Sequence, residues 1–163
     1  MRLYLIRHAI AEEATDTKPD GQRALTAEGV KKFKQAASGM VKAFEETAPA
    51  LILSSPLVRA RQTAAILAKA LEKDGNAAPV KESAALDFPG DLQKLLAEAR
   101  AAKGNVACIG HEPYLSEWVG RLCFMTAGGV EMKKGAVAVI ELAESGARGK
   151  LLQLLPPGIL RKL

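Results

Sequence analysis

The chain has 163 residues, a formal net charge of +5 at pH 7, 48% hydrophobic residues and 25% charged residues. This length and composition are typical of one soluble globular domain, here residues 1–163, and no apolar run approaches the roughly 18 residues that cross a bilayer. Aromatic residues make up only 4% of the chain, too few to interleave with basic residues in a nucleic-acid stacking surface. We therefore expect no membrane or nucleic-acid binding, whereas the surplus of positive charge suits an anionic substrate.

The first half of the chain alternates short apolar segments with longer amphipathic ones. The expected strands are residues 2–7 and 50–54, and the expected helices are residues 26–46 and 56–73. Between the first strand and the first helix, the polar segment 11–23 is expected to be a mobile loop over a site. Pro56 suits the first position of the second helix, with Ser55 as its N-cap.

The second half continues the alternation and ends in two strands. The expected strands are residues 79–82, 105–110, 136–142 and 150–155, and the expected helices are residues 91–102 and 113–124. A turn at 144–147 joins the last two strands, so these two pair antiparallel. Pro156, Pro157 and Gly158 are expected to stop regular structure near the C-terminus.

Strands that alternate with helices predict an α/β fold. We expect a three-layer α/β/α sandwich with a mostly parallel sheet of about six strands, one of them antiparallel near the C-terminal end. In open sheets of this kind, ligands bind at the carboxyl ends of the parallel strands. The residues that follow each strand are therefore the first to examine for function.

Both histidines of the chain fall at expected strand ends. His8 ends the first strand beside Arg7, His111 follows the fourth strand, and Arg59 lies on the helix after the second strand. Taken singly, a histidine here is more often a hydrogen-bonded structural residue, and an arginine early in a helix often faces solvent. Together they predict a cluster of cations at one sheet edge, which is unfavourable to bury without an anion. A bound phosphate removes that cost.

The chemistry of these residue types fits phosphoryl transfer. Arginine donates two parallel hydrogen bonds to phosphate oxygens, and the start of the 56–73 helix adds backbone N–H groups. A neutral imidazole can attack phosphorus, and flanking arginines would keep His8 neutral. Metal chemistry is disfavoured, because Glu112 is the only acid adjacent to a histidine in the sequence and nearby guanidinium groups repel cations. We therefore expect no metal at this site.

Four segments in chain order resemble the motifs of the histidine phosphatase superfamily. The segments are Leu5 to Ala9, Arg23 to Gly29, Ser54 to Ala64, and Gly110 to Glu112. The first resembles the Arg-His-Gly signature, and the second resembles an R-x-L-T-x-x-G entry to the first helix. The third resembles the second-arginine motif, and the last resembles the second-histidine motif.

The short chain, without a large helical insertion after the second strand, resembles the SixA-type phosphohistidine phosphatases of this superfamily. Those enzymes remove phosphate from histidines of signalling proteins such as phosphotransfer domains. The resemblance implies that His8 is the nucleophile and that Arg7, Arg59 and His111 bind the phosphoryl oxygens. It also implies a phosphorylated partner protein, a location in the bacterial cytoplasm and no metal or cofactor. We expect a monomer.

Two features depart from the superfamily pattern. Ala9 stands where glycine is usual, and only a small difference in backbone approach is expected from one methyl group. A general acid has no clear motif: Glu82, Asp87 and Asp91 lie in the region where larger members carry it, and Asp87 is preferred. For each of the three, a solvated loop carboxylate is the more common role of such a residue. A phosphohistidine substrate needs this acid less, because imidazole is a better leaving group than an alkoxide.

Two other functions remain open at this stage. The same chemistry could act on small phosphate esters or sugar phosphates, although the chain has few residues to spare for a walled and lidded pocket. A phosphoprotein-binding module without turnover is the other alternative. The presence of every chemical residue of the motifs argues against this second one.

Overall fold

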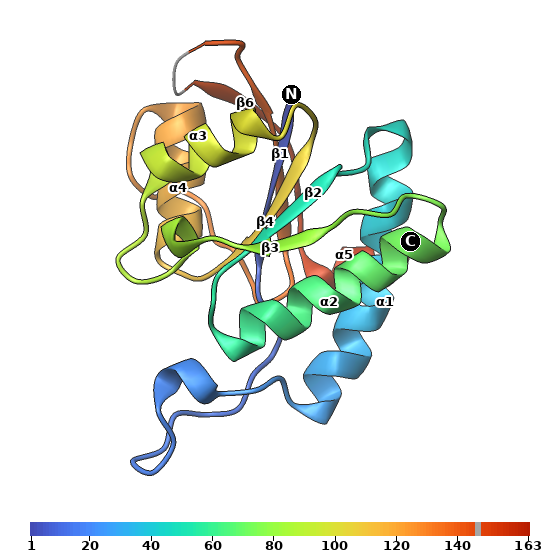
Figure 1. The fold of residues 1–163 in the computed structure, drawn as a ribbon, viewed down its shortest axis with the longest axis vertical. Helices are drawn as coiled ribbons and strands as arrows, with labels where there is room; N and C mark the ends of the chain where they lie inside the picture. The colour runs from blue at the N-terminus through green and yellow to red at the C-terminus, as the bar shows by residue number, and fades with distance from the viewer. Residues whose placement is uncertain (146–147) are drawn as a thin grey trace.

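A computed structural model describes residues 1–145 and 148–163, so the expected turn at 144–147 lies partly outside the described residues. Six strands form one sheet in the order β3-β2-β4-β1-β5-β6 (Figure 1). The strands are β1 (Arg2–Arg7), β2 (Leu51–Ser54), β3 (Val80–Glu82), β4 (Val106–Gly110), β5 (Val137–Leu142) and β6 (Gly149–Leu155). All six lie within two residues of their expected bounds.

The described helices follow the expected alternation. The α-helices are α1 (Ala27–Phe44), α2 (Val58–Lys73), α3 (Leu92–Ala101), α4 (Tyr114–Phe124) and α5 (Pro157–Leu160). Three short 3-10 helices are η1 (Asp20–Gln22), η2 (Glu45–Thr47) and η3 (Ala84–Leu86). None of the helices in the described part of the chain is both long and apolar enough to span a membrane.

The sheet is mixed, as predicted. β1 pairs parallel with β4, β4 with β2, and β2 with β3, whereas β5 is antiparallel to both β1 and β6. β5 is therefore the one strand of the six that runs against the others, which confirms the expected antiparallel strand near the C-terminal end. The carboxyl ends of β1, β2 and β4 consequently meet at one edge of the sheet.

Helices cover both faces of the sheet, so the fold has three layers (Figure 1). Successive side chains of β1 point to opposite faces: Tyr4 and Ile6 pack into the core under α1, α2 and α5, and Leu3 and Leu5 pack into the core under α3 and α4. All four side chains are buried. The central strands are thus apolar on both faces, as parallel strands between two helical layers must be.

The start of α1 explains part of the second motif. The Thr26 hydroxyl caps the helix by accepting a hydrogen bond from the Gly29 amide at 2.9 Å. The Thr26 amide donates to the Ile10 carbonyl at 3.1 Å, and a Cβ at Gly29 would lie 2.0 Å from that same oxygen. Glycine therefore lets α1 begin directly against the backbone that follows β1.

Two sequence expectations were wrong. α2 begins at Val58 with Leu57 as its N-cap, so Ser55 is not the cap and Pro56 is not in the helix. Pro157 begins the short helix α5 instead of ending regular structure, because proline lacks only an N–H that a first helical turn does not use. Leu160 of α5 is fully buried in the core that also contains α1 and α2, which holds this C-terminal turn in place.

Candidate active site

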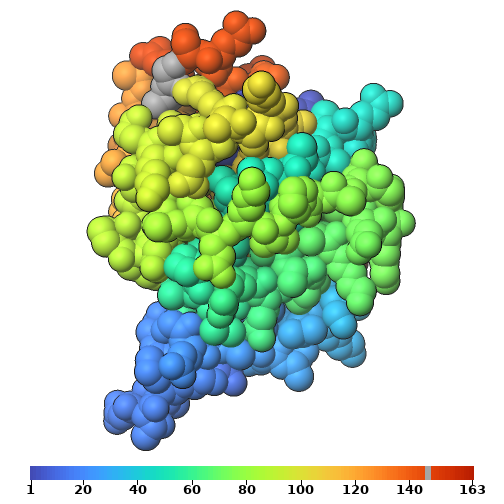
Figure 2. All heavy atoms as spheres, viewed as in Figure 1, coloured from blue at the N-terminus to red at the C-terminus, as the bar shows by residue number. Residues whose placement is uncertain are grey.

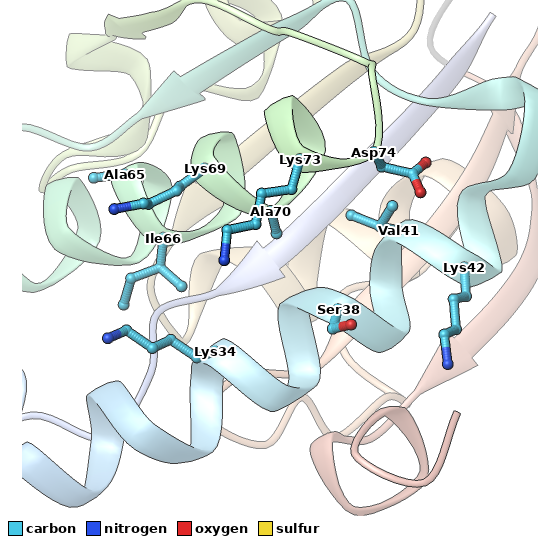
Figure 3. A pocket seen from close by; sticks show the side chains of 10 residues that line it. All are labelled: Lys34, Ser38, Val41, Lys42, Ala65, Ile66, Lys69, Ala70, Lys73 and Asp74. Carbon is cyan, nitrogen blue, oxygen red and sulfur yellow. The ribbon is translucent and has the colours of Figure 1, made fainter.

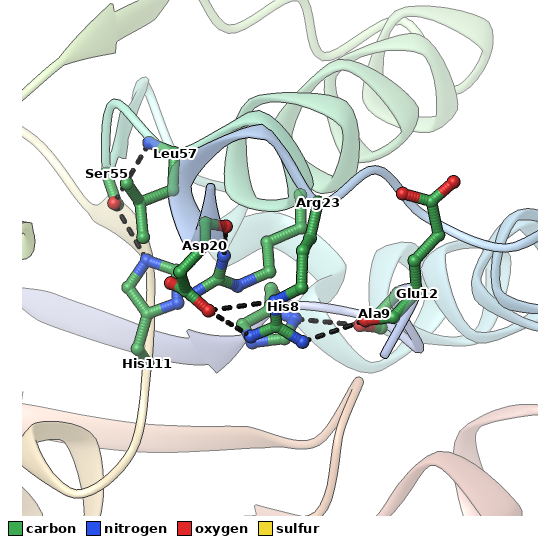
Figure 4. Close-up of polar contacts among 9 residues, drawn as sticks. His8, Ala9, Glu12, Asp20, Arg23, Ser55, Leu57 and His111 are labelled. Atoms are coloured by element: carbon green, nitrogen blue, oxygen red, sulfur yellow. Dashed lines mark hydrogen bonds and ion pairs between the residues drawn. The ribbon is translucent and has the colours of Figure 1, made fainter. Parts of the chain in front are cut away.

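The two histidines lie side by side at the carboxyl ends of β1 and β4. Their ring centroids are 5.0 Å apart, and the rings are tilted by 53° (Figure 4). The His8 amide donates to the Gly110 carbonyl at 3.1 Å, which continues the parallel pairing of β1 and β4 one step beyond the strands. Sheet pairing itself therefore brings His8 and His111 together, as the sequence predicted.

His8 is held in one tautomer. Its Nδ1 lies 2.7 Å from the Ala9 carbonyl oxygen, which can only accept a hydrogen bond (Figure 4). Nδ1 therefore carries the proton, and Nε2 keeps its lone pair. A neutral imidazole in this tautomer is a nucleophile at Nε2.

The methyl group of Ala9, at the position where glycine is usual, is packed in the core. Ala9 is 3% exposed and belongs to the core under α1 and α2. Its amide donates to Thr63 Oγ1 at 3.1 Å, and the Thr63 hydroxyl donates to the Arg59 carbonyl at 2.7 Å. The backbone after His8 is thus fastened to α2 by one buried threonine.

Burial is the largest cause of the low pKa of His8, which falls from 6.5 to about 4. The hydrogen bond to the Ala9 carbonyl raises the pKa, and the charges of Arg59, Arg7 and Lys134 lower it further. The flanking arginines, the expected cause, do lower the pKa, but removal of the ring from water lowers it more. The imidazole is neutral at physiological pH.

Arg7 and Lys134 are positioned by the segment that leads into β5. Arg7 Nη1 donates to the Met132 carbonyl at 2.7 Å, and the Gly135 amide donates to the carbonyls of Arg7 and His8 at 3.0 and 3.2 Å. Gly135 has a φ of +82°, a left-handed conformation that favours glycine. Lys134 was not identified from the sequence, because nothing local to it indicates that its chain segment returns to the end of β1.

Arg59 does not face solvent. Its side chain is 3% exposed, and it donates from Nη1 to the Asp20 carbonyl at 2.8 Å and from Nη2 to Asp20 Oδ2 at 2.9 Å. Asp20 also accepts from Arg23. Partial burial raises the pKa of Asp20, but the hydrogen bonds from Arg59 and Arg23 outweigh it and hold the pKa below the usual value.

The segment 11–23, expected to be a mobile loop over a site, therefore contacts the site through Asp20. The 3-10 helix η1 begins at Asp20, and the blue segment that contains it projects from the lower end of the molecule in Figure 2. Asp20 was not predicted as a site residue. The only local signal for Asp20 was its position three residues before Arg23, the arginine of the R-x-L-T motif.

His111 contacts Ser55, which was predicted only as the N-cap of a helix. His111 Nε2 lies 2.8 Å from Ser55 Oγ, and Ser55 Oγ accepts from the Leu57 amide at 3.3 Å (Figure 4). Burial lowers the pKa of His111 from 6.5 to about 3, and the charges of His8 and Arg59 lower it further, against a raising effect of Asp20. Ser55 thus links the end of β2 to the residue that follows β4.

Three buried nitrogen atoms of this cluster have no hydrogen-bond partner within the described residues. They are Nε of Arg7, Nε of Arg59 and Nδ1 of His111. An unpaired buried polar group costs about 1–3 kcal/mol, and more where it is charged. The charges of both arginines act on His8, so the three side chains share its surroundings. Acceptor oxygens of an anion would pair these donors.

The three carboxyl groups considered as general acids lie in different settings. Glu82 forms an ion pair with Arg61 at 3.3 Å, and Asp91 caps α3 by accepting from the Lys94 amide at 2.9 Å. Asp87 is half-buried at the end of η3, where its amide donates to the Ala84 carbonyl at 3.2 Å, and its carboxyl group has no hydrogen-bond or ion-pair partner among the described residues. Its role as the acid stays a prediction.

Two further observations concern possible metal ligands and a surface groove. Within residues 1–145 and 148–163, no three His, Cys, Asp or Glu side chains gather in a way that could hold a metal ion. A groove of about 570 Å³ lies between α1 and α2, and four of its lining residues are Lys34, Lys42, Lys69 and Lys73 (Figure 3). Neither histidine lines this groove, so it is separate from the cluster around His8.

The low pKa values predict that neither histidine takes up a proton in the range where free histidine does. With only two histidines in the chain, nitrogen NMR of the imidazoles can follow both, and loss of one signal set in His8→Gln assigns them. We expect both rings to be neutral at pH 5.5, with His8 protonated at Nδ1. A protonation midpoint near pH 6.5 for either ring would contradict the effect of burial.

The same pKa values bear on stability. Since the unfolded chain binds these protons near pH 6.5, acidification below that value lowers the free energy of unfolding.

The Asp20–Arg59 pair predicts competition between this carboxylate and an oxyanion. An anion must displace Asp20 from the Arg59 donors, so Asp20→Ala is expected to tighten binding of inorganic phosphate by about tenfold, equivalent to about 1.4 kcal/mol. Titration calorimetry measures the affinity. Asp16→Ala, an exposed acid of the same segment, is the control for net charge. Equal affinities in both variants would show that Asp20 does not compete.

Comparisons with known proteins agree with the motifs. Residues 3–87 match the model of the histidine phosphatase superfamily (branch 1). An uncharacterized protein of Picosynechococcus sp. (strain ATCC 27264 / PCC 7002 / PR-6) is 35% identical over 153 residues, which cover 91% of this chain and 88% of the relative.

Several solved phosphatases share the fold. The structure of the protein histidine phosphatase SixA complexed with tungstate superposes with a TM-score of 0.81 at 23% identity and covers 97% of this chain and 98% of its own. Mycobacterial glucosyl-3-phosphoglycerate phosphatase superposes with a TM-score of 0.69 at 17% identity, and the match covers 95% of this chain and 98% of that one. The Shigella flexneri alpha-ribazole phosphatase superposes with a TM-score of 0.67 at 16% identity, and the match covers 96% of this chain and 97% of that one. With its matching family model and its clustered histidines and arginines, the chain belongs to the histidine phosphatase superfamily.

Proposed function

We propose that the protein is a phosphohydrolase that forms a covalent phosphohistidine on His8 and removes phosphate from a phosphohistidine of a signalling or phosphotransfer protein. The observation that carries this proposal is the state of His8: a neutral imidazole with its proton fixed on Nδ1 by the Ala9 carbonyl. Its free Nε2 lies in surroundings that bear the charges of Arg7 and Arg59. A nucleophile with a lone pair beside anion-binding cations suits attack on a phosphoryl group.

In the first step, the Nε2 lone pair of His8 forms a bond to phosphorus while the phosphorus–nitrogen bond of the substrate breaks. The electron pair of that bond stays on the leaving imidazole, which takes up a proton. Arg7, Arg59 and His111 bind the phosphoryl oxygens and neutralise their charge. The Ala9 carbonyl accepts the Nδ1–H throughout and so stabilises the positive charge that develops on the His8 ring.

In the second step, water adds to phosphorus and the bond to His8 Nε2 breaks. The bonding pair returns to Nε2, and inorganic phosphate leaves with release of the proton that replaces the one consumed in the first step.

Asp87 is the proposed proton donor to the imidazole that leaves in the first step. It directly precedes Phe88, whose ring contacts His111, so its backbone position is next to the cluster.

One of the fold comparisons supports a protein substrate. The tungstate complex of SixA, a protein histidine phosphatase, superposes better than the two phosphatases of small molecules. A small phosphate ester or sugar phosphate remains the second candidate, supported by those two neighbours. A phosphoprotein-binding module without turnover is the least supported, because it gives no reason for a nucleophilic His8. We propose further that residues 1–163 act as one monomeric domain in the cytoplasm.

The mechanism predicts a phosphoenzyme on His8. Wild type incubated with a phosphorus-32-labelled phosphotransfer domain is expected to retain label that is stable to alkali and labile to acid, as for a phosphorus–nitrogen bond. His8→Ala removes the only Nε2 nucleophile of the scheme and is expected to retain none. His111→Gln is the matched control: it is expected to form the label more slowly. Label on the His8→Ala variant would place the nucleophile elsewhere.

The substrate proposal predicts a preference for phosphohistidine over phosphate esters. Because imidazole leaves more readily than an alkoxide, kcat/KM on a phosphorylated phosphotransfer domain is expected to exceed that on a panel of sugar phosphates by a factor of about ten or more, or about 1.4 kcal/mol in barrier height. Rates measured with His8→Ala correct for uncatalysed hydrolysis of each compound. A preference for the esters would reject the protein substrate while leaving the phosphohistidine mechanism intact.

A further inference from the structure

An exposed aromatic ring lies beside the two histidines. Phe88 has 48% of its surface exposed. Its ring centroid is 5.2 Å from that of His111, and the two planes meet at 31°. His111 in turn lies 5.0 Å from His8, so a single ring connects Phe88 with the proposed nucleophile.

Neighbouring side chains hold Phe88 in this position. Its ring lies 5.6 Å from that of Tyr114, which stacks on the buried Trp118 at 5.9 Å. Two residues further along the chain, a Cβ at Gly90 would lie 2.7 Å from the Trp118 ring and 2.8 Å from the Tyr114 ring. The segment 88–90 is therefore pressed directly against α4, and the exposed face of Phe88 is presented by a packed support.

The position of Phe88 suggests what it meets. The cations around His8 suit the phosphoryl group, and Phe88 offers a partly exposed apolar ring next to His111. A substrate whose phosphoryl group reaches His8 extends its leaving group out of the buried cluster. An apolar ring gives a sugar hydroxyl no hydrogen-bond partner, but it packs well against a planar aromatic ring.

We propose that Phe88 determines specificity by packing against the planar leaving group of the substrate, the imidazole ring of phosphohistidine. This inference rests on the proposed function and adds a residue that recognises the leaving group. As the phosphorus–nitrogen bond breaks, the bonding electron pair stays on the ring and one proton adds to it, so neutral imidazole leaves while the face of Phe88 packs against it. Phe88 acts on the leaving group and not on the phosphoryl oxygens.

Two small substrates separate this role from general activity. N-phosphoimidazole and phosphoramidate both contain a phosphorus–nitrogen bond, but only the first has an aromatic leaving group. Phe88→Leu is expected to lower kcat/KM on N-phosphoimidazole by about tenfold and to change that on phosphoramidate by less than about twofold. Phe88→Trp restores an aromatic face and is expected to recover most of the loss.

Phe124→Leu is the matched control, because Phe124 is 53% exposed at the end of α4 and contacts neither histidine ring among the described aromatic pairs. It is expected to leave both substrates unaffected. An equal loss on both substrates in Phe88→Leu, or no loss on either, would overturn the role of Phe88. Failure of wild type to hydrolyse either compound would instead overturn the proposed function, and the choice of imidazole with it.

Discussion

The parallel pairing of β1 with β4 is the interaction on which the rest of the site depends. The register sets Ile6 opposite Ile109 and Arg7 opposite Gly110, and the next amide, that of His8, still bonds to Gly110. Because side chains alternate between faces, a slip of one residue would turn a strand's buried side chains to the opposite face and separate its histidine from the other. The 5.0 Å approach of the two rings is therefore a property of the sheet.

Around that pairing, the fold gathers positive charge in a buried place and supplies little to neutralise it. Asp20 is the carboxylate that contacts Arg59, and it comes from a segment that projects from the molecule. Removal from water, together with the cations, keeps both imidazoles uncharged. The same desolvation that makes the free site unfavourable thus keeps the His8 imidazole neutral and favours the binding of anions.

Much of this could be predicted from the sequence, because apolar periodicity marks strands and the residues after them. The placement of His8, His111, Arg7 and Arg59 follows from that rule and from the motifs. Asp20 on Arg59 and Ser55 on His111 could not be predicted in the same way, since these contacts join residues 39 and 56 positions apart with no local pattern. The dominance of burial in the His8 pKa likewise depends on how completely the helices cover the ring.

The hydroxyl of Thr63 links the backbone after His8 to the turn of α2 that carries Arg59. It accepts from the Ala9 amide and donates to the Arg59 carbonyl, with no exposed surface of its own. The backbone that follows His8 and the turn of α2 that carries Arg59 are therefore joined through one buried side chain. A displacement of this turn of α2 would move the Ala9 backbone with it, which limits changes in the separation of His8 and Arg59.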